Sequence, residues 1–358
     1  MVNRTFIVAE AGVNHNGSLD LALQLVDVAA HAGADAVKFQ TFKADQVATQ
    51  QATKAHYQVV DTREGESQRA MLRGLELAPA DHEALLVRCR ERGIHFMSTA
   101  FDAQSLAFLA TLEMPALKIA SGDITCGPLL LQAARLRRPT ILSTGMSTLA
   151  DIEQALGVMA FGLTLDREPR SRVDFDVAYR SPEGREALER YVTLLHCVTQ
   201  YPAPPAAVNL RAMDTMATAF GLPVGLSDHT LGLEVSIAAV ALGATVIEKH
   251  FTIDRTLPGP DHAASLEPRE LTQLVSAIRN IECALGSPIK GLAPCEVGNQ
   301  PVARRSIVAA RVIRRGEAFT AEMLAAKRPG HGLSPMEMWS LIGRVAGRDY
   351  DVDELIEP

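Results

Sequence analysis

Short apolar runs alternate with helix-length segments along most of the chain, and this rhythm restricts the possible folds more than any other feature. The runs are rich in Val, Ile and Leu and are bounded by Gly, Pro or polar residues, which is typical of buried strands. They cover residues 5–9, 36–40, 94–99, 116–120, 140–143, 191–196, 222–229 and 244–250. Eight strands separated by helices, over close to the usual length of about 250 residues, predict an α/β fold, a (β/α)8 TIM barrel.

Capping residues and glycine stops mark the expected helices between these runs. Ser18 is a candidate N-cap, and Gly33 a candidate stop, for a helix over residues 19–32. Asn209 is expected to cap a helix that Gly221 ends. Further helices are expected over 79–92, 102–111, 128–138, 232–242 and 266–284, and from Ser147 or Thr148 onward.

Several stretches depart from this rhythm. Residues 45–71 are polar and without a clear period, which predicts a long loop that could cover an active site. Residues 161–190 are charged and too long for an ordinary barrel connection, which favours a solvated surface insertion. After the barrel, expected over 1–285, the polar residues 286–300 indicate a linker. Short β-rich pieces over 301–358 predict a second domain, small enough to gain stability by docking on another surface.

Charge and composition disfavour several kinds of partner. The net charge is -7 and the basic residues are dispersed, which argues against nucleic acid or an anionic membrane as the main partner. No apolar run approaches the ~20 residues needed to span a bilayer, and the first residues do not resemble a signal peptide. Five scattered cysteines without a CxxC motif indicate a reducing compartment. We therefore expect a soluble, cytoplasmic protein.

Polar residues gather at the carboxyl ends of the predicted strands, which is where the active site lies in a (β/α)8 barrel. Packing alone does not require so many polar side chains at one mouth of a barrel. The residues at these ends are Glu10, Lys38, Gln40, Thr99, Lys118, Ser121, Ser143, His196, Tyr201, Ser227, His229, Glu248 and His250.

Two of these residues, His229 and His250, directly follow apolar runs that are expected to be neighbouring parallel strands. Neutral imidazole is a common ligand for Zn, Mn and Fe, and the acids Asp228, Glu248 and Asp261 lie nearby in the sequence. A single histidine at a strand end is more often a packed or capping residue. Two in matching positions leave a divalent-metal site and a structural role both open.

Two lysines, Lys38 and Lys118, lie inside otherwise apolar strands. Burying an ammonium group without a partner is costly, so each lysine is expected to meet an anion. With hydroxyls and a possible metal at the same mouth, this suits a substrate that carries phosphate and carboxylate groups. A Schiff-base lysine is the alternative, and metal-dependent aldol-like addition and phosphoryl-group chemistry both remain open.

Ordered motifs along nearly the whole chain resemble one family. They are AEAGVNHNG from Ala9, AVKFQTFKAD from Ala36, FMSTAFD from Phe96, LKIASGD from Leu117, ILSTGM from Ile141, HCVTQYPAP from His196, GLSDHT from Gly225, IEKHFTIDRTLPGPDH from Ile247 and KRPGHGLSPMEMW from Lys327. These motifs resemble the sialic acid synthase family, which includes N-acetylneuraminate, legionaminate and pseudaminate synthases. The small C-terminal domain, which carries the last motif, resembles the antifreeze-like (SAF, β-clip) domain of these enzymes. Residues 161–190 depart from the shorter members of the family.

The resemblance implies condensation of phosphoenolpyruvate with open-chain N-acetylmannosamine and water, giving N-acetylneuraminate and phosphate. The alternative acceptor is 2,4-diacetamido-2,4,6-trideoxymannose, which would give N,N'-diacetyllegionaminate. Two other hypotheses belong to different classes. One is another metal-dependent barrel aldolase, and the other is a non-catalytic carbohydrate- or ice-binding protein, suggested by the terminal domain alone.

The resemblance also implies roles for residues. His229 and His250 match the family's ligands for Mn2+, which Mg2+ or Co2+ could replace. Thr199 stands where some members place Asn near phosphoenolpyruvate. Gln40 and Asp228 are also expected to bind substrate. Positions that hold phosphoenolpyruvate are matched by Lys38, Thr99, Lys118, Ser121, Ser143 and Ser227.

Three residues, Glu10, Tyr201 and Asp261, match positions around the sugar. We expect Glu10 to orient the attacking water or to stabilise positive charge at the phosphate-bearing carbon. Arg328 matches the arginine that a partner subunit's antifreeze-like domain inserts into the barrel. The resemblance therefore implies a domain-swapped homodimer. The residues expected to be catalytic are Glu10, Lys38, Lys118, Asp261 and Arg328.

Overall fold

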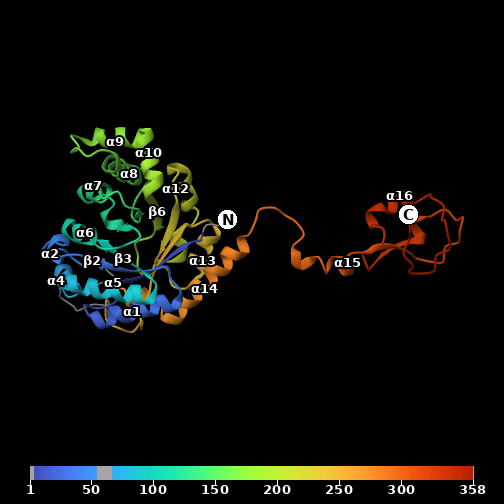
Figure 1. The fold of residues 1–358 in the computed structure, drawn as a ribbon, viewed down its shortest axis with the longest axis horizontal. Helices are drawn as coiled ribbons and strands as arrows, with labels where there is room; N and C mark the ends of the chain where they lie inside the picture. The colour runs from blue at the N-terminus through green and yellow to red at the C-terminus, as the bar shows by residue number, and fades with distance from the viewer. Residues whose placement is uncertain (1–3, 55–66, 358) are drawn as a thin grey trace. The chain divides into compact units, whose positions relative to one another are not determined.

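The structure, a computed structural model, describes residues 4–54 and 67–357. The chain divides into two compact units, Met1–Gly286 and Ser287–Pro358, and Figure 1 shows the fold of each. Part of the predicted loop over 45–71 lies outside the described residues. Its described ends form short helices, α2 (Ala44–Val47) and the first residues of α4 (Gln68–Arg73).

The first unit contains a closed barrel in which each strand pairs in parallel with the next and β8 pairs with β1. This confirms the predicted TIM barrel, and each predicted run overlaps one strand. The strands are β1 (Phe6–Gly12), β2 (Ala36–Thr41), β3 (His95–Ala100), β4 (Leu117–Ile119), β5 (Thr140–Ser143), β6 (Val192–Cys197), β7 (Val224–Asp228) and β8 (Val246–His250).

Helices follow the strands around the barrel. They are α1 (Leu19–Ala32), α5 (Pro79–Arg92), α6 (Ala103–Leu109), α7 (Gly127–Arg135), α8 (Leu149–Thr164), α9 (Arg172–Arg180), α10 (Pro182–Tyr191), α11 (Pro205–Val208), α12 (Ala212–Phe220), α13 (Glu234–Ala241) and α14 (Pro268–Leu285). The side chains of Ser18 and Thr148 cap α1 and α8 as predicted. The predicted cap at Asn209 is wrong. Asn209 follows α11 with a φ of 51°, and α12 begins only at Ala212.

The interpretation of residues 161–190 as a solvated insertion is also wrong in part. Phe161 belongs to α8 and is fully buried, and α9 and α10 pack against α8 (Figure 1). A Cβ on Gly184 would lie 1.9 Å from the carbonyl oxygen of Ala178, so the α9–α10 turn requires glycine there. The charged residues that suggested a solvated segment lie on the outer side of an ordered helical layer.

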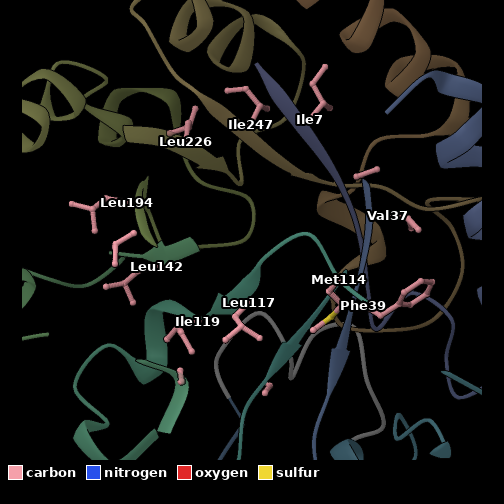
Figure 2. Packing of buried hydrophobic residues seen from close by; sticks show 14 of the residues in the cluster. Ile7, Val37, Phe39, Met114, Leu117, Ile119, Leu142, Leu194, Leu226 and Ile247 are labelled. Carbon is pink, nitrogen blue, oxygen red and sulfur yellow. The ribbon is translucent and has the colours of Figure 1, made fainter. Parts of the chain in front are cut away.

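Alternation along each strand divides the barrel into an outer core and an inner core. Outward-facing residues such as Ile7, Val37, Leu117 and Ile247 belong to the cluster that also contains the buried faces of the helices (Figure 2). A separate inward-facing cluster lies nearer the amino ends of the strands and consists of Val8, Ala36, Met97, Ala116, Ile141, Leu195 and Val246. Towards the carboxyl ends the inward positions become polar, so the polar site lies above this layer of apolar side chains.

The second unit has its own small core around Ile307, Phe319 and Tyr350. Its antiparallel strands are β9 (Ser306–Ala309) and β10 (Leu324–Lys327), flanked by the short helices α15 (Gln300–Ala303) and α16 (Met338–Leu341). Across both units, none of the described helices has the length and apolar character needed to cross a bilayer.

Candidate active site

A cavity of about 280 Å³ opens at the carboxyl ends of the barrel strands. Every barrel residue that was expected to bind substrate or metal or to take part in catalysis lines it, except Asp228. These residues are Glu10, Lys38, Gln40, Thr99, Lys118, Ser121, Ser143, Thr199, Tyr201, Ser227, His229, His250 and Asp261. His196, noted at the end of a strand, does not line it either, and its Nε2 contacts the carbonyl of Val208. Strand register explains how side chains so distant in sequence come together. In the parallel pairing Glu10 lies beside Lys38, Thr99 beside Lys118, and Ser227 beside Glu248.

The cavity floor is a buried cluster of two lysines and two glutamates. Lys38 Nζ lies 2.8 Å from Glu10 Oε2, 3.5 Å from Glu248 Oε2 and 2.9 Å from Thr99 Oγ1. Lys118 Nζ lies 3.7 Å from Glu248 Oε1, which also accepts a hydrogen bond of 2.8 Å from Ser227. The anions that the lysines require are thus partly supplied by the protein itself.

The charges in this cluster respond to burial and to one another. Burial alone would lower the pKa of Lys38, but the carboxylates of Glu10 and Glu248 outweigh it and the pKa is raised. Burial lowers the pKa of Lys118, opposed by Glu248. For Glu10 burial wins over the charge of Lys38 and raises its pKa, whereas the two lysines hold the pKa of Glu248 below its usual value despite burial. One glutamate is therefore readily protonated and the other stays ionised.

Hydroxyl groups line the wall beside this cluster. Ser121 Oγ accepts a hydrogen bond of 2.9 Å from the backbone N–H of Gly145. A Cβ at position 145 would lie 2.2 Å from Thr199 Oγ1 and 2.8 Å from Ser121 Oγ, so this approach requires glycine. The hydroxyl of Ser143 is buried and meets no hydrogen-bond partner among the described residues, so it remains available to a ligand.

His229 and His250 face each other across the mouth, with ring centroids 5.5 Å apart. His229 Nδ1 donates a hydrogen bond of 2.7 Å to the carbonyl of Val198, which leaves Nε2 as the acceptor nitrogen. His250 Nδ1 is buried without a hydrogen-bond partner among the described residues, and burial holds the pKa of His250 well below its usual value. Burial lowers the pKa of His229, but Cys197 and the carbonyl of Val198 outweigh burial and the pKa is raised. His250 is therefore the neutral ring, and both imidazoles are nitrogen donors of the kind that a divalent metal binds.

Few other side chains near His229 and His250 could serve as metal ligands. Asp261 Oδ2 lies 3.9 Å from His250 Nδ1, and burial raises the pKa of Asp261 to about 6. The Tyr201 ring lies against the ring of His229, with the centroids 4.1 Å apart and the ring planes tilted by 33°. Within residues 4–54 and 67–357, three or more His, Cys, Asp or Glu side chains are nowhere gathered to hold a metal ion. A metal at the two histidines would therefore take further ligands from water or substrate.

Asp228, expected to bind substrate, is turned away from the cavity. Its carboxylate accepts hydrogen bonds from Lys249 Nζ at 2.9 Å, Ser236 Oγ at 2.7 Å and the N–H of Thr230 at 2.8 Å, all on the outer side of the strands. Because Ser227 faces the cavity, the next residue along the strand must face outward. Asp228 therefore holds the connection from β7 to α13.

Glu248, by contrast, lines the cavity although it was noted from the sequence only at a strand end and was given no role. Glu248 and His250 are two residues apart on β8, so both face the barrel interior when one does. That alternation could have identified Glu248 from the sequence.

Arg328 lies in the second unit, is exposed, and donates a hydrogen bond of 3.0 Å through Nε to the carbonyl of Ala303. Among the described residues no carboxylate pairs with Arg328.

Comparison with known proteins decides the family. The NeuB family model matches residues 25–290, about three quarters of the chain, and the SAF domain model matches residues 304–356. The chain belongs to the NeuB family. The SAF match confirms the predicted antifreeze-like domain, and NeuB synthases condense phosphoenolpyruvate with amino sugars. This NeuB protein is therefore an enzyme of the transferase type.

Relatives of this NeuB protein include synthases of several nonulosonic acids. The chain is 44% identical over 355 residues to an N,N'-diacetyllegionaminic acid synthase from Campylobacter jejuni, covering 99% of each chain. It is 45% identical over 338 residues to one from Legionella pneumophila, covering 94% of this chain and 89% of that one. Identity to the human N-acetylneuraminate-9-phosphate synthase is 33%, over 98% and 92% of the two chains.

Solved structures agree with the fold. A crystal structure of N-acetylneuraminic acid synthetase from Leptospira borgpetersenii matches with a TM-score of 0.66 and 34% identity. The match covers 83% of this chain and 90% of that chain.

Proposed function

We propose that this enzyme condenses phosphoenolpyruvate with 2,4-diacetamido-2,4,6-trideoxymannose and water, giving N,N'-diacetyllegionaminate and phosphate. The observation that carries the choice of acceptor is the 44% and 45% identity to two N,N'-diacetyllegionaminic acid synthases, against 33% to the human N-acetylneuraminate-9-phosphate synthase. N-acetylmannosamine, the first choice from the sequence, is less well supported. It stays the natural comparison substrate.

The buried lysines support binding of phosphoenolpyruvate at the cavity floor. Lys38 and Lys118 would offset the charge of its phosphate and carboxylate, and the hydroxyls of Ser121, Ser143 and Thr199 would donate hydrogen bonds. Glu248, held ionised by both lysines, keeps their positions fixed before the substrate arrives. Part of this interaction is equally strong in the ground state and in the transition state, so it contributes to binding as well as to rate.

His229 and His250 would hold a divalent ion, with Mn2+, Mg2+ or Co2+ as candidates. Such an ion, when bound, supplies Lewis acidity toward the aldehyde oxygen of the open-chain sugar. Tyr201 and Asp261 lie against this pair and would position the sugar, while Gln40, 3.3 Å from Glu10 through its Nε2, would orient that carboxylate.

The chemical steps balance without a further reactant. The enol carbon of phosphoenolpyruvate forms a bond to the aldehyde carbon, and the aldehyde oxygen takes up a proton. Positive charge develops at the phosphate-bearing carbon, where water adds and loses a proton. The C–O bond to phosphate then breaks while the new hydroxyl gives up its proton to the departing phosphate, leaving a 2-keto acid and inorganic phosphate. Glu10, whose pKa is raised by burial, is suited to orient the water and exchange its proton.

The same proposal includes a homodimer in which Arg328 reaches the barrel of the partner. Support comes from the family resemblance around Lys327 and from the exposure of Arg328 without a carboxylate partner among the described residues. Its guanidinium would bind acetamido or hydroxyl groups of the sugar.

One assay tests the reaction. The purified enzyme is incubated with phosphoenolpyruvate, Mn2+ and either sugar, and phosphate and the 2-keto acid are measured together. We expect both products in equal amounts, with the diacetamido sugar giving the higher kcat/KM. A 2-keto acid substrate cleaved without phosphate release would favour a metal-dependent aldolase instead, and no turnover of any substrate would contradict an enzymatic role.

A further inference from the structure

The proposed reaction assigns no role to one side of the cavity, which is apolar apart from Gln68. Four side chains there form a cluster separate from the main core: Val13, Phe42, Met71 and Leu75. Leu72 and Phe101 pack against this cluster, and Val47 lines the cavity beside it. We call these seven residues the apolar wall. They come from the ends of β1, β2 and β3, from the helices α2 and α4 and, for Leu75, from the segment directly after α4.

The apolar wall lies next to the reacting groups. β1 pairs with β8, which carries His250, and the last residue of β1 is Gly12. A Cβ on Gly12 would lie 3.3 Å from His250 Cε1 and 3.3 Å from Gln40 Nε2. Because Gly12 has no side chain, the space between His250 and the apolar wall, which begins at Val13, is not filled by a side chain at position 12. A sugar with its aldehyde at the histidines can therefore extend along the wall.

The wall offers a ligand very different contacts from those of the floor. Its seven side chains provide no hydrogen-bond donor or acceptor, whereas Lys38, Lys118 and the serine hydroxyls lie below. A hydroxyl group pressed against such a surface loses its water without gaining a partner, whereas a methyl group gains from burial. Leu72 is only half-buried and Val47 is 40% exposed, so both have surface left for a ligand to cover.

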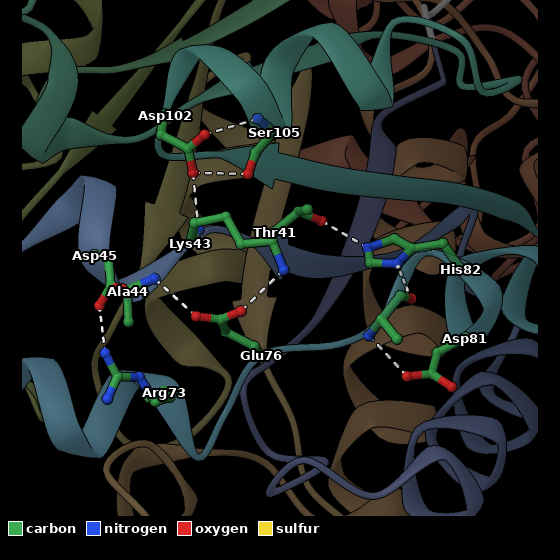
Figure 3. A network of polar contacts seen from close by, with 11 residues as sticks. Thr41, Lys43, Ala44, Asp45, Arg73, Glu76, Asp81, His82, Asp102 and Ser105 are labelled. Atoms are coloured by element: carbon green, nitrogen blue, oxygen red, sulfur yellow. Dashed lines mark hydrogen bonds and ion pairs between the residues drawn. The ribbon is translucent and has the colours of Figure 1, made fainter.

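Polar contacts behind the wall hold its helices in place (Figure 3). Glu76 accepts hydrogen bonds from the N–H of Ala44 and from Lys43 Nζ, both at 2.9 Å. Asp102 accepts one of 2.9 Å from the N–H of Lys43. Asp45 on α2 pairs with Arg73 on α4 at 2.5 Å. These polar contacts hold α2 and α4 in place from the side that faces away from the cavity, and the side that faces the cavity stays apolar. A surface that selects between ligands needs such fixed support.

We propose that the apolar wall selects acceptor sugars whose far end carries a methyl group in place of the C6 hydroxyl. This inference rests on the proposed function, since it concerns the acceptor of that reaction. The diacetamido sugar is 6-deoxy and ends in a methyl group, and N-acetylmannosamine ends in a hydroxymethyl group. Leu72 and Val47 are the specificity-determining residues, and they act on the acceptor without touching the reacting atoms.

The test compares two sugars that differ in one group: N-acetylmannosamine and its 6-deoxy analogue. Both kcat/KM, from phosphate release, and Kd, from calorimetry, are measured. In the unmodified enzyme we expect the 6-deoxy sugar to be preferred by about 10- to 100-fold, the range for one group in an apolar pocket. Leu72→Asn and the isosteric Val47→Thr should each reduce this ratio about tenfold.

Leu285→Asn is the matched control, because Leu285 is 44% exposed at the end of α14 and does not line the cavity. Its ratio should equal that of the unmodified enzyme. An unchanged ratio in both wall variants, or no preference in the unmodified enzyme, would overturn the inference. If the diacetamido sugar of the proposed function releases no phosphate, that function fails, while the ratio of Kd values for the two test sugars still decides the role of the wall. Absence of binding by both sugars would overturn the wall as well.

Discussion

The ammonium of Lys38 lies 2.8 Å from the carboxylate of Glu10, and both side chains are almost completely buried on neighbouring strands. In spite of Lys38, burial raises the pKa of Glu10 from 4.5 to about 7. Between these values the folded state binds a proton that the unfolded chain does not. The contribution of Glu10 to stability is therefore fully present below pH 4.5 and is lost as the pH rises through about 7.

Glu10→Gln should remove this dependence. The melting temperature of the variant, minus that of the unmodified enzyme, should increase between about pH 5 and pH 7 and level off above it. The linked free energy is at most about 3.5 kcal/mol, since the pKa rises from 4.5 to about 7 and each pKa unit corresponds to about 1.4 kcal/mol. Calorimetric scans in the presence of a chelator measure it, and a difference that stays constant across this range would refute the raised pKa.

Lys118→Ala should weaken phosphoenolpyruvate binding while leaving the affinity for the sugar nearly unchanged. The Kd for phosphoenolpyruvate should rise about 100-fold, because a buried charge contact is lost and Glu248 then faces the substrate with less compensation. Titration calorimetry with each substrate separates the two affinities, and Lys290→Ala, at an exposed lysine of the second unit, is the control. A larger loss for the sugar would mean that the phosphate site has been misplaced.

His229→Ala and His250→Ala should each abolish turnover and reduce Mn2+ binding, with the fold intact. The reason is the loss of an imidazole ligand and, with it, of Lewis-acid polarisation. Mn2+ titration and circular dichroism distinguish loss of the ion from loss of structure. Full activity of the unmodified enzyme after exhaustive chelation would show that no metal takes part.

Asp228→Asn should affect stability far more than chemistry. The substitution leaves the buried ammonium of Lys249 without its carboxylate, which costs about 3–5 kcal/mol when one partner of a buried pair is removed. The KM values of the folded fraction should remain close to normal, because Asp228 does not line the cavity. Denaturant unfolding measures the loss, and Asp228→Asn combined with Lys249→Met should recover part of it. A variant of normal stability with a raised KM would instead return Asp228 to the substrate site.

Mixing two inactive chains tests whether Arg328 completes the partner's site. Arg328→Ala and His229→Ala subunits are combined under conditions that allow exchange. If each site draws on two chains, some mixed dimers contain one site built only from intact parts, and activity returns to a fraction of normal. If mixing restores nothing although subunit exchange is demonstrated, each chain completes its own site.

The sequence by itself determined the features that depend on neighbouring residues. Ser18 and Thr148 cap helices where they were expected to, because a cap is a bond to a backbone N–H only three residues away. The barrel followed from eight apolar runs, because only a buried parallel strand suits such a run between helices. Lysines inside apolar strands required anions, because desolvation penalises an unpaired ammonium wherever it occurs.

Only the tertiary structure decided which face of each strand or helix meets the cavity. Asp228 was expected to bind substrate and Glu248 was given no role, yet the barrel turns Asp228 outward to Lys249 and Glu248 inward to Lys118. The charged helix α9 became part of an ordered layer only because α8 offers a buried surface to it. The apolar wall joins α4 to the ends of three strands, an arrangement that depends on contacts between distant segments, and no local pattern encodes those contacts.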